Sequence, residues 1–442
     1  MSHGPWPVVR GMCPRAYDLM SGFACALWYA DGMNRSQEKE LIDQIVRHLV
    51  QACPRRYPTS ESEDKAQQLV RIYLEEAGLR TEFHSFSFNA SAAANVALHF
   101  GLGTVGTVLG GVAPRLAFAL HAGSALSYYA ESMHRGYLLR RLFPHRPCRN
   151  VLGVLPSHKE PRLRVVFMAH TDAAFTGLIF DSRVVQAISH RLPPGLGWLH
   201  RPLSLATRAH VALSGIDLLR SVVGPLAFPL RPLEFLLTLP SAAVFLASLE
   251  VALRNEVVPG ANDNLSGVAA LPVLARRLAE DQPEDVEFVF VSTAAEEAMM
   301  GGADALARHV ESSWDKAKTV LIVLDTLSLG SLRFLDPEGQ IGPLPVPFWL
   351  RETVEAAAAS EARFHDVQAF RPPVGGTDAA PFLARGWDAV ALTCIDPSLG
   401  SARHYHQMTD DPDHLDLDQV LHAVDFAEAL ARRIVRDRSR AQ

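Results

Sequence analysis

The chain has 442 residues, which is enough for one large α/β domain or two smaller ones. Its formal net charge of -6 provides no basic surface, so a nucleic-acid partner is not expected. The 5 cysteines are scattered without a CxxC pair, which argues against a disulfide framework and a cysteine zinc site and fits a reducing compartment.

The N-terminal part shows regular patterns only after an opening segment, residues 1–35, that has no clear period. Residues 36–52 repeat apolar side chains on one helical face, which predicts a helix capped by Ser36. The Ser-Glu-Ser-Glu pattern at residues 60–63 predicts a capping box for a second helix. The alternation over residues 79–88 predicts a strand.

Two apolar segments then interrupt the pattern, at residues 92–149 and 175–254. In the first, residues 92–112 are uncharged over about 20 residues, which is long enough to cross a bilayer. Residues 116–130 are also uncharged but shorter, and a group of arginines follows over residues 135–149. This order predicts a helical hairpin that leaves the main domain and returns on the same side.

The second apolar segment contains the runs 221–230 and 235–249, which are interrupted by prolines and do not reach the spanning length alone. One interpretation is membrane association through residues 92–130 and 221–249, and the basic flank of the first segment then places the main domain in the cytoplasm. The other is a buried lid or a dimer interface in a soluble cytoplasmic protein. The sequence predicts no oligomeric state.

The remaining residues, 36–91, 150–174 and 255–442, form the main domain. Short β-branched runs at residues 150–155 and 163–169 are typical of buried strands. Further along, strands are predicted at residues 286–292, 320–325 and 389–394, and helices at residues 264–280, 303–312, 347–360 and 415–436. Alternating strands and helices predict an α/β fold with a mostly parallel or mixed sheet and helices on both faces.

Three polar residues, His170, Glu297 and Asp325, lie at or just past the carboxyl ends of predicted strands. Ligands bind at this edge in open α/β sheets. Apolar strands that end in histidine or acidic residues need a reason, because burying an unpaired charge is costly. A divalent metal supplies one, and imidazole with carboxylates but without thiolate suits zinc.

A tight polar turn at residues 258–267 adds a further carboxylate, Asp263, just before a predicted helix. Taken alone, Asp263 is explained by helix capping. With Glu297, Asp325 and two imidazoles it exceeds the ligand set of one tetrahedral ion. The set suits two ions that share one bridging carboxylate. We also expect a cis peptide bond between Asp263 and Asn264, because such bonds are associated with active sites.

Five motifs occur in a fixed order along the chain: His-x-Asp at 170–172, Gly-Ala-Asn-Asp-Asn-x-Ser-Gly-Val at 260–268, Glu-Glu at 296–297, a strand ending in Asp325, and Tyr-His at 405–406. This order resembles the co-catalytic zinc aminopeptidases of metallopeptidase family twenty-eight. That family also holds glutamate carboxypeptidases and is related to glutaminyl cyclases. The resemblance covers about residues 38–88, 150–172 and 259–442, and it omits both apolar segments.

The resemblance implies two zinc ions per chain. One would be held by His170 and Asp325 and the other by Glu297 and His406, with Asp263 bridging them.

It also implies that Glu296 is the general base and acid and that Asp172 is the carboxylate that orients His170. His406 is favoured over His404 because its spacing to the downstream acidic residues matches the family pattern.

The sequence departs from the family pattern in two places. The usual Tyr-His-Thr and Asp-Thr are here Tyr405-His406-Gln407 and Asp410-Asp411, and the usual Ser-Asp-His is Thr377-Asp378-Ala379. The metal ligands survive both changes, whereas the contacts on the substrate side are expected to differ.

The function predicted from this resemblance is that of a dinuclear zinc exopeptidase, specifically an aminopeptidase, with a peptide substrate. A glutaminyl cyclase-like acyltransferase with one zinc is the first alternative. A non-catalytic membrane protein that kept the fold is the second, and Glu296 argues against it because a binding module has no use for a general base.

Overall fold

The computed structural model describes residues 32–181, 183–184, 201–224, 229–372 and 375–440, so most of the predicted N-terminal segment lies outside the described residues. One mixed sheet has eight strands in the order β1-β2-β4-β3-β5-β8-β6-β7. The strands are β1 (Arg80–Phe88), β2 (Arg146–Leu155), β3 (Leu163–His170), β4 (Val286–Thr293), β5 (Thr319–Leu324), β6 (Ser331–Leu335), β7 (Gln368–Phe370) and β8 (Asp388–Ile395).

The centre of the sheet is parallel. Strands β4, β3, β5 and β8 pair in parallel, whereas β1 pairs antiparallel to β2, β2 to β4, and β6 to β8. The central strands are apolar because both of their faces are buried, as in β5, where every residue is buried. The predicted α/β fold class is confirmed.

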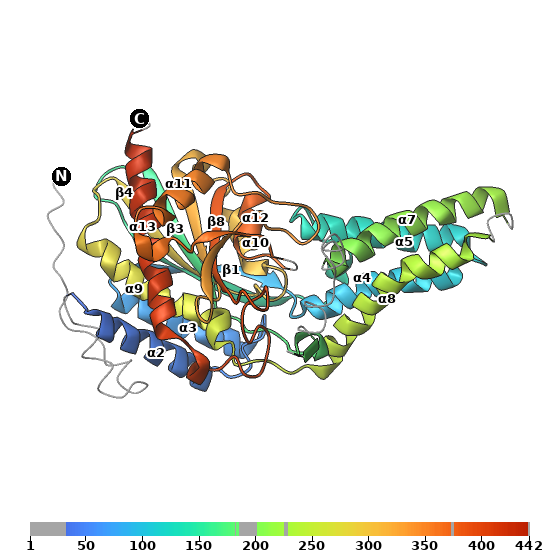
Figure 1. Cartoon of the computed structure of the whole chain (residues 1–442), viewed down its shortest axis with the longest axis horizontal. Coiled ribbons are helices and arrows are strands. Elements are labelled where there is room, and N and C mark those ends of the chain that lie inside the picture. The colour runs from blue at the N-terminus through green and yellow to red at the C-terminus, as the bar shows by residue number, and fades with distance from the viewer. Residues whose placement is uncertain (1–31, 182, 185–200, 225–228, 373–374, 441–442) are drawn as a thin grey trace.

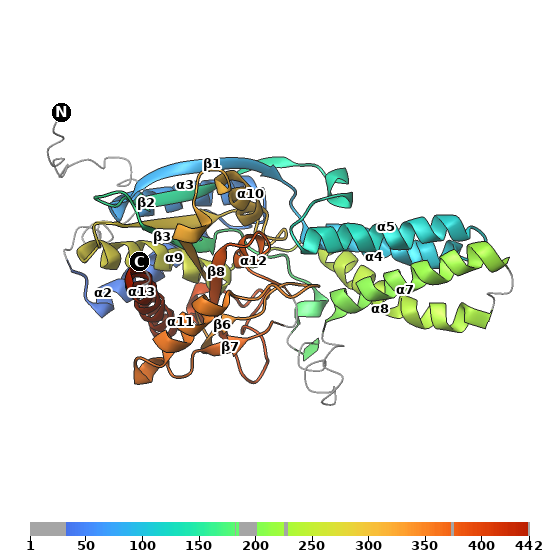
Figure 2. The ribbon, with the colours of Figure 1, turned by 90° about the horizontal axis from the view of Figure 1, so that it is seen from above.

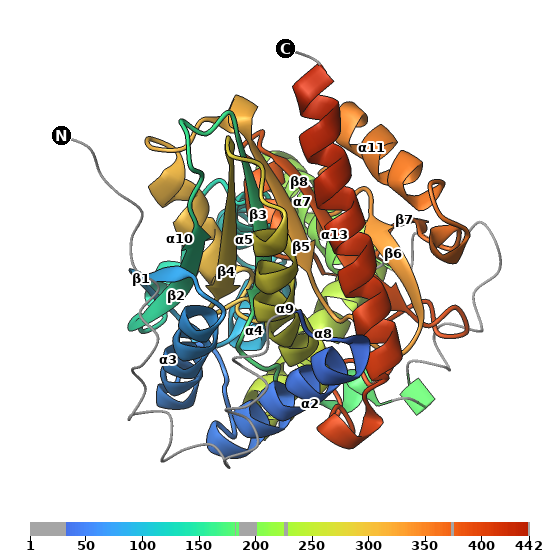
Figure 3. The ribbon, with the colours of Figure 1, turned by 90° about the vertical axis from the view of Figure 1, so that its left-hand side faces the viewer.

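Helices cover both faces of this sheet. One face carries α2 (Arg35–Ala52), α3 (Glu61–Glu76), α9 (Ser266–Glu280), α11 (Phe348–Ala358) and α13 (Leu417–Arg440). The other carries α10 (Gly301–Val310) and α12 (Ala379–Leu383). Alternate residues of one strand therefore enter different cores: in β3, Phe167 packs with the first set and Met168 with the second. Figure 3 shows α9 and α13 lying across the first face.

Local capping differs from the sequence prediction at two helices. Helix α2 is capped by Asn34 rather than Ser36, and Asn34 forms a reciprocal capping box with Gln37. At α3, Ser60 caps the amide of Glu63 as predicted, but the Glu63 carboxylate does not return to Ser60. It accepts hydrogen bonds from the amides of Thr59 and Ala295 instead, so the expected capping box is only half formed. Strands β6 and β7 were not predicted.

Four further helices form a bundle that projects from one end of the sheet (Figures 1 and 2). They are α4 (Ala92–Leu109), α5 (Pro114–Ser132), α7 (Pro202–Val223) and α8 (Arg231–Arg254). We call them the helical bundle. Helix α7 ends at Val223, before Gly224, whose φ is +61°, and residues 225–228 of the predicted apolar run 221–230 lie outside the described residues. Pro240 lies inside α8 and does not end that helix, contrary to the interruption that the sequence predicted.

The helical bundle is attached at the carboxyl edge of the parallel strands. Strand β1 is parallel in direction to β4, because both run antiparallel to β2. The first apolar segment begins just after the end of β1 and returns at the start of β2, which is at the same edge. The second begins after β3 ends at His170 and returns at the Phe175–Val257 bridge. Both hairpins therefore leave and return where the polar residues of the next section gather.

Candidate metal centre

The predicted ligands reach one place from five parts of the chain. His170 is the last residue of β3, Asp325 follows β5 directly, and Glu297 lies in the turn after β4. Asp263 belongs to the short helical turn η5 (Ala261–Leu265) before α9, and His406 lies in the loop that leads to α13. The three strands are neighbours and parallel, so their carboxyl ends place these side chains together.

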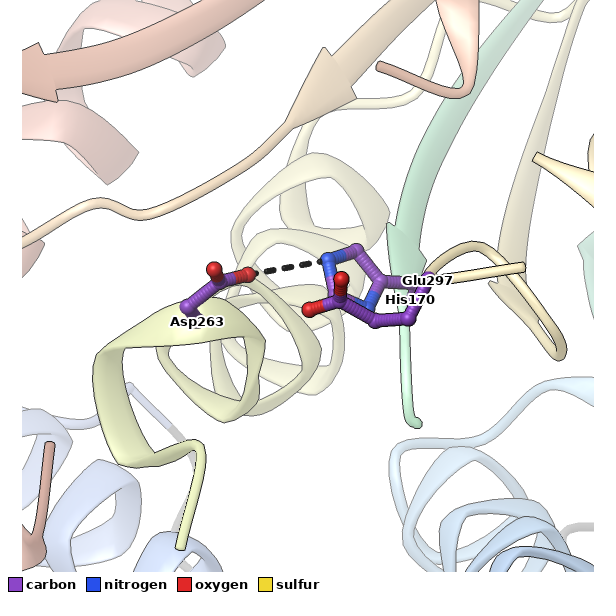
Figure 4. Close-up of side chains that lie close together, drawn as sticks. All are labelled: His170, Asp263 and Glu297. Carbon is purple, nitrogen blue, oxygen red and sulfur yellow. Dashed lines mark ion pairs between the residues drawn. The ribbon is translucent and has the colours of Figure 1, made fainter. Parts of the chain in front are cut away.

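The two carboxylate oxygens of Asp263 face two different histidines. Its Oδ1 lies 3.2 Å from Nε2 of His170, and its Oδ2 lies 3.4 Å from Nε2 of His406. Oε2 of Glu297 lies 3.2 Å from Nε2 of His406, and Oδ1 of Asp325 lies 3.9 Å from Nε2 of His170. The five side chains thus divide into two groups that share Asp263. Figure 4 shows Asp263 pointing toward His170 and Glu297.

The structure also separates the two candidate histidines of the last motif. His404 Nδ1 bonds to Thr409 Oγ1 at 2.7 Å, and its ring packs against His414. The ring of His406 instead lies beside Asp263 and packs against Phe180. The geometry places His406, and not His404, at the shared carboxylate.

Glu296 and Asp172 lie beside this centre. Glu296 is 9% exposed, and its Oε2 lies 3.9 Å from Nε2 of His170. Asp172 Oδ1 lies 3.6 Å from Nδ1 of His170, the position of the predicted orienting carboxylate. Asp172 also accepts hydrogen bonds from the amides of Glu296, at 3.1 Å, and Glu297, at 2.9 Å. The Asp172 carboxylate therefore holds the Glu-Glu turn, whereas the hydrogen-bond partner of His170 Nδ1 is the backbone carbonyl of Asp172, at 3.2 Å.

The turn that carries Asp263 is held by its own neighbours. The Asp410 carboxylate accepts the amides of Asn262 at 2.7 Å and Asp263 at 3.1 Å. The peptide bond between Asp263 and Asn264 is cis, as predicted. A Cβ at Gly260, where φ is +62°, would lie 2.7 Å from the Asp263 carbonyl oxygen, so only glycine fits there.

Sequence reasoning missed several residues that support the centre. Arg56 is buried and donates to the carbonyls of Thr171, Pro259 and Gly260, which joins the turn to the end of β3. No motif in the sequence pointed to Arg56. Asp378 contacts Thr293 through Oδ2. Its motif, residues 377–379, had been noted only as a departure from the family pattern.

The centre gathers more negative than positive groups. Burial raises the pKa of Glu297 and raises that of Asp378 to about 7. Burial and the neighbouring carboxylates raise the pKa of Glu296 well above its ordinary value, even though His170 opposes the shift. Burial lowers the pKa of His406, but Glu297 and Asp263 outweigh it and raise that pKa to about 10. Such crowding is relieved when bound cations neutralise the carboxylates.

Two further observations favour metal binding by these side chains. His170, Asp263 and Glu297 each offer one ligand atom, and these atoms lie within 4.8 Å of one another. The buried Oε1 of Glu297 has no hydrogen-bond partner among the residues that the structure describes. Imidazole nitrogens and carboxylate oxygens are zinc ligands.

Comparison with known proteins identifies a family for part of the chain. Residues 248–431 match the model of Peptidase family M28, which confirms the predicted family over this part of the chain. No protein of curated function matches the chain in sequence.

Three solved structures are similar in fold. BSAP, a zinc aminopeptidase from Bacillus subtilis, has a TM-score of 0.54 and 13% identity over 89% of this chain and 94% of its own. Porphyromonas gingivalis glutaminyl cyclase has a TM-score of 0.52 and 12% identity over 91% of this chain and 99% of its own. A Zn-dependent exopeptidase from Parabacteroides distasonis has a TM-score of 0.50 and 13% identity over 88% and 96%. At these identities the likeness shows the fold alone.

Proposed function

We propose that this chain, a zinc metallopeptidase whose residues 248–431 match peptidase family M28, is a dinuclear exopeptidase and specifically an aminopeptidase. The observation that supports two ions is the placement of Asp263, whose two oxygens face His170 and His406 separately. A carboxylate that served one ion would not need a second imidazole on its far oxygen.

The residues that would hold zinc are His170 and Asp325 on one side and Glu297 and His406 on the other, with Asp263 shared. The chemistry that zinc supplies at such a site, when bound, is polarisation of the scissile carbonyl and a lowered pKa of the attacking water.

Glu296 is the residue that we propose moves protons. Its carboxylate is nearly buried beside the centre and is not one of the five proposed metal ligands. It can therefore accept a proton from the attacking water. The same carboxyl group then donates a proton to the leaving amine. Asp172 holds the backbone amide of Glu296 and so keeps the carboxylate in position. Glutaminyl cyclisation is the rival reaction, because a glutaminyl cyclase shares this fold.

The test is the zinc content of the purified full chain together with its activity on peptides. We expect about two zinc ions per chain, because Asp263 would be shared by two metal sites. As expected for an aminopeptidase, the protein should release N-terminal residues and should not cleave N-acetylated peptides. Asp263→Asn should lose zinc and activity together, because it weakens both sites. Asp418→Asn, at an exposed carboxylate on α13, is the matched control and should keep both.

One zinc ion per chain together with cyclisation of N-terminal glutamine would replace this proposal with the acyltransferase. Full zinc content and activity in Asp263→Asn would show that Asp263 does not bridge two zinc ions.

A further inference from the structure

The helical bundle buries a small apolar cluster and a set of polar side chains that bond to one another, and it exposes many large apolar side chains. Helix α8 shows the outer surface best. Its exposed large apolar side chains are between 46% and 75% exposed: Leu233, Phe235, Leu236, Leu239, Leu246 and Leu253. Only 17% of the apolar stretch of α8 is buried inside the protein. Water would penalise this arrangement, because exposing apolar surface costs free energy in proportion to its area.

The interior of the helical bundle is a polar network that joins all four helices. His121 of α5 bonds through Nδ1 to Asp217 of α7 at 2.7 Å and through Nε2 to Thr107 of α4 at 3.2 Å. Thr107 in turn bonds to Thr238 of α8 at 2.9 Å. Nearer the distal end, Arg220 pairs with Glu234. These groups find their partners in the protein, as polar groups must where no water is available.

Small residues make room for this network. A Cβ at Gly103 of α4 would lie 2.0 Å from Nε2 of His210, and one at Gly106 would lie 3.0 Å from Nε2 of His121. Both glycines therefore let a histidine ring approach the backbone of α4. Close approach of helices through small residues, with polar side chains bonding across them, is typical of helix pairs in membranes.

The outer apolar surface has the height of a bilayer. Within α8, all of whose residues the structure describes, no exposed charged side chain lies between Arg231 at the distal end and Glu250 near the main domain. That separation corresponds to about 28 Å of helix, and the hydrocarbon core of a bilayer is about 30 Å thick. Arg115 is also exposed at the distal end, where α5 begins. Arg231 and Arg115 at the distal end and Arg254 near the main domain can reach the headgroups, while the apolar parts of their side chains lie along the apolar surface.

We propose that the helical bundle crosses a lipid bilayer as two hairpins, with the main domain on one side and the turn between α4 and α5 on the other. The hydrocarbon of the bilayer is the occupant of the outer surface. A second copy of the chain fits less well, because the exposed apolar side chains occur on every helix: Val108 on α4, Leu126 on α5, Val222 on α7 and Phe235 on α8. A dimer would cover one side only.

The first experiment is fractionation of cells that express the full chain, followed by an alkaline carbonate wash. We expect the protein in the membrane pellet, released only by detergent. The double variant Leu236→Arg/Leu246→Arg should lose most of this membrane fraction, because each charge would lie within the hydrocarbon. Phe348→Arg is the matched control, since Phe348 is 74% exposed on α11 of the main domain, and its fractionation should not change.

A second experiment locates the distal turn and does not depend on how the charged variant folds. Val112 is 84% exposed in that turn, and Ser312 is exposed on the main domain. In sealed vesicles, a membrane-impermeant maleimide should label Val112→Cys and Ser312→Cys from opposite sides. Labelling of both from the same side would overturn the crossing. A full chain that is soluble without detergent, as a monomer or as a dimer, would overturn the membrane proposal altogether.

Discussion

The main domain and the helical bundle sort their residues in opposite ways. In the main domain, Phe167 and Phe290 stack within a fully buried core, and ion pairs such as that of Arg47 with Asp413 lie at the surface. In the helical bundle, the ion pair of Arg220 with Glu234 is buried, and leucines are exposed. The proposed membrane crossing accounts for this difference, because the two regions would then fold in two solvents.

Helices α8 and α9 make the contrast concrete. In α9, the apolar residues are buried against the sheet and against α2 and α13. In α8, they face outward along most of the helix. The two helices therefore differ in where their apolar side chains lie: toward a protein core in α9 and away from one in α8.

The largest expected effect is a loss of catalytic rate from a substitution in the main domain that leaves the helical bundle unchanged. Glu296→Gln removes the proposed proton acceptor without removing a ligand, so kcat should fall by about 10²–10⁴-fold while zinc content stays the same. Membrane fractionation should not change, because the substituted residue lies outside the helical bundle. Steady-state kinetics with zinc analysis measure both. Glu280→Gln, at an exposed residue on α9, should leave kcat unchanged, and an unchanged rate in Glu296→Gln would refute the assignment.

Removing one phenyl ring from the main domain should lower the free energy of unfolding much more than removing one from the helical bundle. Phe290→Ala empties a packed position in the main domain and should lower the free energy of unfolding by about 3–5 kcal/mol. Phe235→Ala removes the same group from the outside of the helical bundle and should change it by less than about 0.5 kcal/mol in detergent. Thermal unfolding of both variants in one detergent measures the difference. Equal losses would mean that Phe235 is packed and that the contrast between the regions is false.

The buried ion pair of the helical bundle offers a third comparison. Glu234→Leu leaves Arg220 inside the helical bundle without its main partner and should lower the free energy of unfolding by about 3 kcal/mol. This is near the lower end for the loss of one partner of a buried ion pair, because the Arg220 guanidinium still donates to the Gly110 carbonyl. The double variant Arg220→Met/Glu234→Leu should recover most of the loss. Unfolding in detergent tests this, and a double variant no more stable than the single one would show that the charges themselves are required.

The last prediction concerns His84, a half-buried histidine on the edge strand β1. Burial lowers the pKa of His84 to about 4, and its Nδ1 accepts a hydrogen bond from Asn150. The unfolded chain takes up this proton near pH 6.5, whereas the folded chain does so only near pH 4. This contribution to stability is therefore present above pH 6.5 and is lost as the pH falls toward 4. His84→Gln should flatten the fall in Tm over this window, and His365→Gln, at an exposed position, should not.

The sequence predicted the main domain well because its patterns are local and its motifs are ordered. Apolar strands ending in His170 and Asp325 indicated both the sheet and its polar edge before any geometry was known. Arg56 could not be predicted in the same way. Its role depends on carbonyls that are adjacent only after folding, and no spacing in the sequence indicates them.

The helical bundle was predicted in part. The apolar runs showed where it lies, but the pairing of Arg220 with Glu234 across two helices could not be seen, because each residue stands alone just before an apolar run. Strands β6 and β7 are short and lie toward the edge of the sheet, where tertiary pairing rather than periodicity defines them.

Both hairpins begin and end at the carboxyl edge of the parallel strands, where Asp263 and its neighbours lie. On the proposed topology, this edge is held at a fixed height above one leaflet and cannot turn away from it. A peptide tethered to the same leaflet would then search for the site in two dimensions, at an effective concentration set by the length of its tether. Substrates that are lipid-linked or newly released from membrane proteins would be favoured over free peptides of the same sequence.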